Sequence, residues 1–217
     1  MWDTSVVHWV RIRLGFLMLA LYMAVVPPPV AAGEESYSGP YLVGRLLVAA
    51  ESMLDPQFYQ TVILILEHDQ SGAFGVVLNR AIGTGPLSDL MAGFDVNPTV
   101  VDEAAMFREI DLRLGGPVEP ARAMVVHSTD YQQPDSHDVG GDLAWTLESS
   151  VLEAAAAGHG PKKLLVFIGY AGWSAGQLEK EIIREDWLDA DADTALVFDT
   201  PTDELYDAVH DAAGLSL

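Results

Sequence analysis

The sequence contains no cysteine, and only three of its 217 residues are lysine. The absence of cysteine excludes disulfide bonds, thiolate metal sites, iron–sulfur clusters and a cysteine nucleophile. Lysine and arginine together number 11 against 32 aspartate and glutamate residues, which gives a formal net charge of −21. Proteins that bind nucleic acids or anionic membranes draw most of their affinity from basic side chains. The charge balance therefore argues against direct binding to either.

Recognisable cofactor and catalytic motifs are also scarce. The sequence has no phosphate-binding P-loop, no H-E-x-x-H zinc motif and no dinucleotide-binding fingerprint. The six histidines show no pair at the short spacing that favours a metal site. We therefore expect no cofactor and no metal site. Half of the residues are hydrophobic, which is enough to build a core and excludes an intrinsically disordered chain.

The first 32 residues have the organisation of a secretory signal peptide. Arg11 and Arg13 precede an apolar run over residues 14–26, three prolines follow, and small residues at 30–32 offer a cleavage site. The run is shorter than the roughly 20 residues that a membrane-spanning helix needs. We therefore expect no membrane span in the mature chain, and the leader predicts an exported or periplasmic protein.

Two alternatives for this segment stay open. It could be a hydrophobic helix docked on the domain, or it could result from a start codon assigned too far upstream, with Met23 as the true start. For a leader or a misassigned start, we expect residues 1–32 to be separate from the fold, residues 33–40 to be a linker and residues 41–217 to form one domain.

The domain has the pattern of an α/β protein. Short apolar segments rich in β-branched residues predict strands, and these cover residues 41–49, 61–66, 76–78, 123–127, 163–170 and 195–198. A short helix is expected over 88–92, and long loops are expected over 95–111, which includes one helical turn, and 130–142.

Three sequences fit the capping box, in which a serine or threonine is followed three residues later by an acid or glutamine. They begin at Ser150, Ser174 and Thr200 and predict a helix after each. Apolar residues at near-helical spacing then mark the inner faces of the second and third helices, namely Leu178, Ile182 and Trp187, and Leu205, Val209 and Ala212.

Two segments could carry a binding function. Glu67 and His68 end an apolar strand, where a partly buried carboxylate could act as an acid or base. The favoured interpretation is that Glu67 only ends the strand and pairs with an arginine such as Arg80. A glycine-rich stretch follows the buried strand 163–170 and opens a helix, where free backbone N–H groups could hold an anion. The candidate ligand-binding residues are therefore Glu67, His68, Asn79, Gly169, Tyr170, Gly172, Trp173, Ser174 and Gly176.

A series of motifs resembles the YqgE/AlgH family from about Tyr41 to the C-terminus. The resemblance is specific because it rests on many short motifs in a fixed order. These are Asp55–Phe58, Glu67-His68, Gly72–Arg80, Gly115–Val118, His127, Gly169–Trp173, Gly176–Glu179, Glu181 and Trp187.

The resemblance implies an α/β (α+β) domain whose mixed sheet folds into an irregular pseudo-barrel flanked by helices. Members are often labelled transcriptional regulators without an established enzymatic activity, so the resemblance transfers no catalytic residue to this chain. The family is usually cytoplasmic and begins near the first strand. The leader and the strong acidity of this chain depart from that pattern.

The favoured hypothesis is a non-catalytic binding or regulatory domain whose ligand is an unknown small molecule or protein. Its surface would be formed by the Gly169–Gly176 turn and the Glu67–Asn79 segment. The rival is a small hydrolase or transferase that holds an anionic ligand at the helix after Ser174, with Glu67 or His68 as the acid–base group. The rival requires these groups to face a shared ligand. A DNA-binding regulator is the least favoured alternative.

The leader hypothesis predicts the N-terminal residue of the protein recovered from cells. Cleavage after Ala32 leaves Gly33 at the N-terminus, and N-terminal sequencing or intact-mass measurement would detect it. A start at Met23 or later would show instead that the start codon is misassigned.

Overall fold

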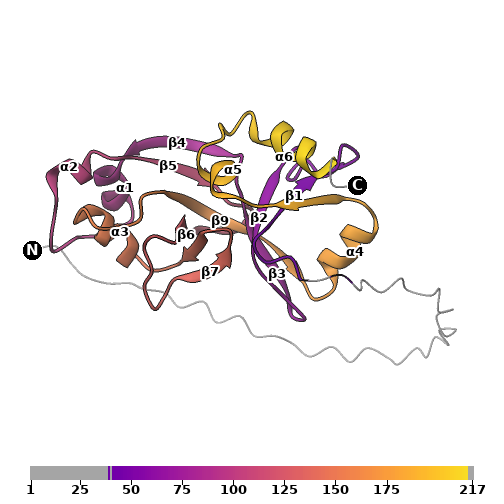
Figure 1. The fold of residues 1–217 in the computed structure, drawn as a ribbon, viewed down its shortest axis with the longest axis horizontal. Helices are drawn as coiled ribbons and strands as arrows, with labels where there is room; N and C mark the ends of the chain where they lie inside the picture. Colours follow the sequence, from indigo (N-terminus) through magenta and orange to yellow (C-terminus); the bar gives the residue numbers. More distant parts are fainter. Residues whose placement is uncertain (1–38, 40, 215–217) are drawn as a thin grey trace, which may run out of the picture. The chain divides into compact units, whose positions relative to one another are not determined.

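The computed structural model describes residue 39 and residues 41–214, so the predicted leader and nearly all of the predicted linker lie outside the described residues. Ten strands form one curled sheet (Figure 1). They are β1 (Arg45–Ala49), β2 (Val62–Asp69), β3 (Gly72–Val77), β4 (Ala81–Pro86), β5 (Glu109–Leu114), β6 (Val118–Ser128), β7 (His137–Gly140), β8 (Leu143–Thr146), β9 (Leu164–Ser174) and β10 (Trp187–Asp191).

Six short helices lie among the described residues and cover the faces of the sheet. They are α1 (Leu87–Gly93), α2 (Glu103–Met106), α3 (Ser150–Ala156), α4 (Gln177–Ile183), α5 (Thr194–Phe198) and α6 (Leu205–Gly214). The main strand order is β10-β1-β2-β3-β9-β6-β8-β7, while β5 pairs in parallel with β9 and carries β4 on its other side. The expected mixed sheet, curled into a partial barrel and flanked by helices, is confirmed.

The buried apolar side chains form three clusters, each on a different part of the sheet. The largest lies on one face of the sheet, which we call the inner face, and α6 covers it through Leu205 and Val209. A second lies between β1–β3 and α4 and includes Leu178 and Trp187. The third lies between the β6–β9 region and helices α1 and α3.

Strand β9 joins the two halves of the sheet. At Gly169 the alternation of its side chains between the two faces of the sheet shifts by one residue. Before this glycine, Leu165 and Phe167 point into the inner cluster. After it, Tyr170 packs against the same cluster, whereas Ala171 and Trp173 belong to the cluster beneath α4. Strict alternation would place residues 165, 167 and 169 on one face. Gly169 has φ +68°, and this left-handed residue shifts the alternation by one position, as in a β-bulge.

The bend at Gly169 is fixed by a close crossing with Gly115 and Gly116. A Cβ atom on Gly116 would lie 2.2 Å from the carbonyl carbon of Tyr170, and one on Gly169 would lie 2.5 Å from the carbonyl oxygen of Gly116. The Gly115 N–H donates to the Ile168 carbonyl at 2.8 Å, and its own carbonyl accepts from Val77 N–H at 2.8 Å. Only glycine lets the two backbones approach this closely.

Several predicted elements are displaced or wrong. Residues 195–198 form helix α5 instead of a strand, because the Asp193 carboxylate accepts a hydrogen bond from Leu196 N–H at 2.8 Å and caps a helical turn. The last strand is β10, and it begins at Trp187, which was expected on a helix. On the final helix the buried small residue is Ala213, not Ala212.

None of the three predicted capping boxes forms as expected. Ser149 precedes α3 in place of Ser150, whose hydroxyl donates to Asp135 at 2.9 Å. Ser174 is the last residue of β9, and α4 begins at Gln177. The Thr200 hydroxyl donates to the Ala195 carbonyl at 3.2 Å, and α6 begins only at residue 205. The Ser174 hydroxyl donates to the Gln177 side chain at 3.1 Å. Each of the three hydroxyls therefore has a partner other than the helix N–H group that a capping box requires.

Strands β4, β5, β7 and β8 were not predicted. Residues 81–86 read A-I-G-T-G-P, a composition typical of a turn, and they become a strand by pairing with β5. The expected loops 95–111 and 130–142 contain the start of β5 and all of β7. These segments become strands because they pair with strands that are distant in the sequence. A local sequence pattern cannot predict such pairing.

The segment 130–142 is tied to the sheet by His127, whose side chain is fully buried. Its Nδ1–H donates to the Ser128 carbonyl at 3.0 Å, which leaves Nε2 to accept from the Ser136 hydroxyl at 3.3 Å. Burial lowers the pKa of His127, and the charges of Asp130 and Asp135 only partly oppose this effect. The folded protein therefore favours the neutral form of the His127 imidazole.

The glycine crossing predicts that Gly116→Ala lowers the free energy of unfolding by about 3 kcal/mol, because the new methyl group meets backbone atoms that cannot move. Urea denaturation would measure the change. Gly83→Ala is the matched control, since no atom lies within 4 Å of its Cβ position, and it should change stability by less than about 0.5 kcal/mol. Equal effects of the two substitutions would contradict the role of the crossing.

The buried His127 predicts a loss of stability in acid. The unfolded chain binds a proton near pH 6.5, whereas the folded chain resists protonation to lower pH. The free energy of unfolding should therefore fall as the pH drops below about 6.5. Urea denaturation from pH 8 to pH 5 would show this fall, and His127→Asn should reduce its slope. His159→Gln, at an exposed histidine, should retain the parent slope, and a common slope for all three proteins would contradict the assignment.

Candidate functional site

The bend in the sheet opens a cleft of about 380 Å³ between the β2–β3 hairpin and β9, which we call the β3–β9 cleft. Four of the predicted ligand-binding residues line it, namely Glu67, Tyr170, Gly172 and Trp173. The other lining residues were not singled out from the sequence, and they are Asp69, Ser71, Gly72, Ala73, Phe74 and Val118.

Aromatic rings form one wall of the cleft. Phe74 contacts Tyr170 edge-on, with ring centroids 5.7 Å apart, and contacts Trp145 at 5.2 Å. Trp145 in turn stacks on His137 at 4.5 Å. This row crosses β9, β3, β8 and β7, and it depends on the shift at Gly169 that turns Tyr170 toward the inner face.

The charged groups of the cleft are acidic. Glu67 is exposed. Asp69 accepts hydrogen bonds from the hydroxyl and the N–H of Ser71, which hold the pKa of its carboxyl group below the ordinary value. The Tyr170 hydroxyl donates to Glu119 at 3.3 Å. Burial, and then the charge of Glu119, raise the pKa of Tyr170, so the phenol stays protonated. Among the described residues that line the cleft, none is basic.

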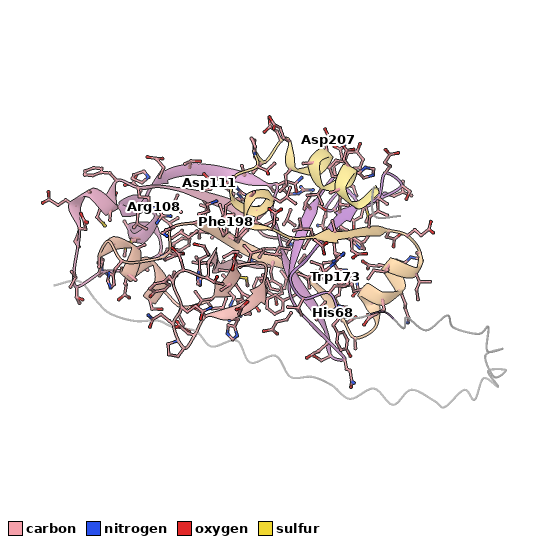
Figure 2. All side chains as sticks on the ribbon, viewed as in Figure 1. His68, Arg108, Asp111, Trp173, Phe198 and Asp207 are labelled. Carbon is pink, nitrogen blue, oxygen red and sulfur yellow. The ribbon has the colours of Figure 1, made fainter. Side chains whose placement is uncertain are left out.

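Glu67 and His68 do not face the same side of the sheet. His68 is buried, its Nδ1 accepts from Leu42 N–H at 3.0 Å, and Nε2 lies 3.3 Å from Glu179 Oε1 on α4. The strand registers place His68 opposite Ala73 and Ala73 opposite Trp173 (Figure 2 labels both His68 and Trp173). Adjacent strand residues point to opposite faces, so Glu67 borders the cleft while His68 anchors α4.

Asn79 and Arg80 also lie outside the cleft and hold a turn. The Asn79 side chain accepts from Val62 N–H at 2.9 Å and donates to the Gln60 carbonyl at 2.8 Å. Arg80 donates to the Gln57 carbonyl at 2.9 Å. The ion pair proposed between Glu67 and Arg80 is therefore replaced by a backbone contact of the arginine.

The glycine-rich stretch is not the turn that the sequence suggested. Residues 164–174 are one strand, whose last four residues pair with β3. The Ser174 N–H donates to the Gln177 side chain at 3.1 Å, and Gly176 is the residue before α4. Backbone groups in a sheet ladder are already paired, so this stretch does not offer the expected cradle for an anion.

Residues 172–176 also match G-x-S-x-G, the pattern of a serine nucleophile elbow, which the sequence reasoning missed. Ser174 ends a strand before a helix, as that motif requires, but its hydroxyl lies 3.1 Å from Gln177 Oε1. The buried His68 beneath this region has one ring nitrogen bound to the backbone and the other facing Glu179. The described residues therefore do not assemble a serine–histidine pair at Ser174.

Trp173 has a structural partner as well as a place at the cleft. Its indole N–H donates to Glu181 Oε2 at 2.7 Å, and the indole of Trp187 donates to the same oxygen at 2.9 Å. Gln177 donates to the other oxygen of Glu181 at 3.0 Å. These contacts fasten α4 to β9 and β10, so the Trp173 ring stabilises the wall behind the cleft.

The structure shows no group of three histidine or acidic side chains in a metal-binding arrangement among the residues it describes. Within that same part of the chain, no helix is long and apolar enough to cross a bilayer. The signal that could have pointed to the cleft is the β2–β3 hairpin itself, where Asp69 and Gly72 flank a two-residue turn and Phe74 pairs with Glu67.

Comparison with known proteins gives a consistent result. A sequence model of a family described as AlgH-like matches residues 46–217. A UPF0301 protein of Methylococcus capsulatus is 38% identical over 191 residues, which cover 88% of this chain and 99% of that protein. A UPF0301 protein of Rhodospirillum rubrum is 38% identical over 166 residues, covering 76% of this chain and 84% of that one.

Solved structures agree with this assignment. The solution structure of the AlgH protein from Pseudomonas aeruginosa is 38% identical, with a TM-score of 0.65 over 83% of this chain and 93% of that chain. The crystal structure of a Corynebacterium diphtheriae protein, 24% identical, shares the fold with a TM-score of 0.62 over 80% and 87% of the two chains. The names of these relatives state no activity. The chain belongs to the AlgH-like family.

Proposed function

We propose that the protein is a non-catalytic binding domain that recognises a cationic group in the β3–β9 cleft. The observation that supports this most directly is the combination of two carboxylates, Glu67 and Asp69, with the rings of Phe74 and Tyr170 in one hollow. A positive charge is attracted both to a carboxylate and to the face of an aromatic ring. An anion would be repelled by the two carboxylates.

The size of the cleft suits one side chain or a small amine. Its volume of about 380 Å³ lies at the lower end of the range for small-molecule sites. An ammonium or guanidinium group is typically stabilised by about 0.5–1 kcal/mol at an exposed aromatic ring. The net charge of −21 adds a long-range attraction that raises the local concentration of cations.

The separation of the predicted acid–base groups favours binding over catalysis. His68 is turned toward α4 and Ser174 contacts Gln177, so neither is positioned to activate the other or to reach Glu67. A regulatory role would then follow from which cationic molecule or protein segment occupies the cleft. The acidic cleft gives no support to the alternative of an anionic substrate or to direct contact with DNA.

The cleft proposal predicts binding of N-acetyl-arginine methylamide, a single guanidinium on a neutral backbone. The neutral citrulline analogue should bind at least tenfold more weakly, because it lacks the charge that the carboxylates attract. Chemical-shift titration would measure both dissociation constants. Glu67→Gln should weaken binding of the arginine compound about tenfold, which corresponds to about 1.4 kcal/mol.

Glu51→Gln is the matched control, since Glu51 is exposed and does not line the cleft. It removes the same charge and should change the dissociation constant by less than twofold. Equal loss in both variants would show only general attraction to an acidic protein. A stronger response to inorganic phosphate than to the arginine compound would contradict the proposed function.

A further inference from the structure

Three strands of the sheet have one edge that is not paired within the described residues, and β4 differs from the other two. Strand β10 carries Asp189 and Asp191, and β7 carries Asp138. Charged residues on an edge strand prevent another strand from adding to it. Strand β4 reads A-I-G-T-G-P, without a charge, and its Ile82 is 54% exposed. Figure 1 shows β4 along the outer margin of the sheet.

One face of the β4–β5 pair borders an apolar hollow of about 440 Å³, which we call the α1 hollow. It is lined by β4, by Leu90 and Phe94 from the α1 region, and by Ile110 and Leu112 from β5. A Cβ atom at Gly83 or Gly85 would meet no atom within 4 Å. The backbone of β4 is therefore open on this side.

The opposite face borders a second, more polar hollow of about 300 Å³, the α5 hollow. Asp111 and Arg113 line it, and because strand residues alternate, they lie on the other face from Ile110 and Leu112. Residues 198–203 close this hollow and add Asp199 and Asp203 (Figure 2 shows Asp111 beside Phe198).

The α5 hollow is acidic in sum. Arg113 is buried, donates to the Leu78 carbonyl at 2.9 Å and pairs with Asp111 at 3.2 Å. Lys163 pairs with Asp199 at 2.6 Å. Asp203 is exposed and adds a further negative charge. An incoming side chain that is positive would be attracted to this hollow.

We propose that β4 is a docking edge for an extended segment of a partner protein in which apolar and basic residues alternate. The segment would add to the sheet as a further strand, with main-chain hydrogen bonds to β4. Its side chains would then point alternately to the two faces. The apolar residues enter the α1 hollow, and the basic residues face the carboxylates of the α5 hollow.

The charge of the protein selects this partner over a second copy of the chain. Two copies joined at β4 would each carry a net charge of −21, and like charges oppose close association. A basic segment is instead attracted over a long range before it docks. Three residues line both hollows of the docking edge, namely Gly83, Thr84 and Leu112. No residue of either hollow lines the β3–β9 cleft.

The test uses a fluorescein-labelled heptapeptide in which lysine alternates with leucine or valine, added to the full chain. Fluorescence anisotropy should show saturable binding. A peptide of the same sequence, N-methylated at alternate residues, keeps the charges but loses donors for the sheet, and it should bind at least tenfold more weakly. Amide hydrogen exchange of residues 81–85 should slow when the unmethylated peptide is added.

Two variants locate the binding. Gly85→Leu should fill the α1 hollow without disturbing the fold, because its Cβ position is open, and should weaken peptide binding at least tenfold while keeping the parent melting temperature. Glu67→Gln, in the β3–β9 cleft, should leave peptide binding within twofold, so the two proposals fail separately. Equal binding of the N-methylated peptide, an unaffected Gly85→Leu variant, or a dimer of the free protein that Gly85→Leu abolishes would each overturn the docking edge.

Discussion

The backbone crossing of Gly115 and Gly116 with Gly169 is the constraint on which the rest of the structure depends. It lets β9 leave one half of the sheet and enter the other while its side chains change faces. The aromatic wall exists because Tyr170 turns inward at this point. The cluster beneath α4 exists because Trp173, the next-to-last residue of the strand, turns outward. The cleft is therefore a consequence of how the sheet is bent.

Electrostatics then gives the bent sheet a preference among ligands. The cleft and the docking edge lie on different parts of the sheet, yet each combines an apolar surface with carboxylates. In the α5 hollow, Arg113 and Lys163 pair with two of them, and Asp203 carries the excess negative charge. In a chain with a net charge of −21, we expect such places to favour amines and basic segments over phosphates. Hydrophobic contact supplies affinity, and the sign of the charge supplies selection.

The sequence predicted much of the fold because several signals were local. Apolar runs revealed parts of β1, β2, β3, β6 and β9, and the family motifs correctly indicated the curled mixed sheet. The segments that were wrong or missed depend on distant partners. Residues 81–86 become a strand only beside β5, and Asp193 turns the apolar residues after it into a helix by capping Leu196.

The candidate site was predicted only in part, for a similar reason. Four predicted residues line the cleft, but alternation along β2 separates Glu67 from His68, and the ladder with β3 removes the backbone donors expected near Gly172. Phe74 and Asp69 were missed because a hairpin turn looks ordinary in a sequence. Their importance comes from Tyr170, which lies about a hundred positions later in the chain.

The shared carboxylate of Glu181 has a practical consequence for anyone who handles this protein. The indole N–H groups of Trp173 and Trp187 both donate to one oxygen of Glu181, and the centroids of the two rings lie 6.0 Å apart. Indole emission is sensitive to such bonds and to the entry of water. The ultraviolet emission of Trp173 and Trp187 should therefore change when α4 leaves the sheet, and no dye has to be attached.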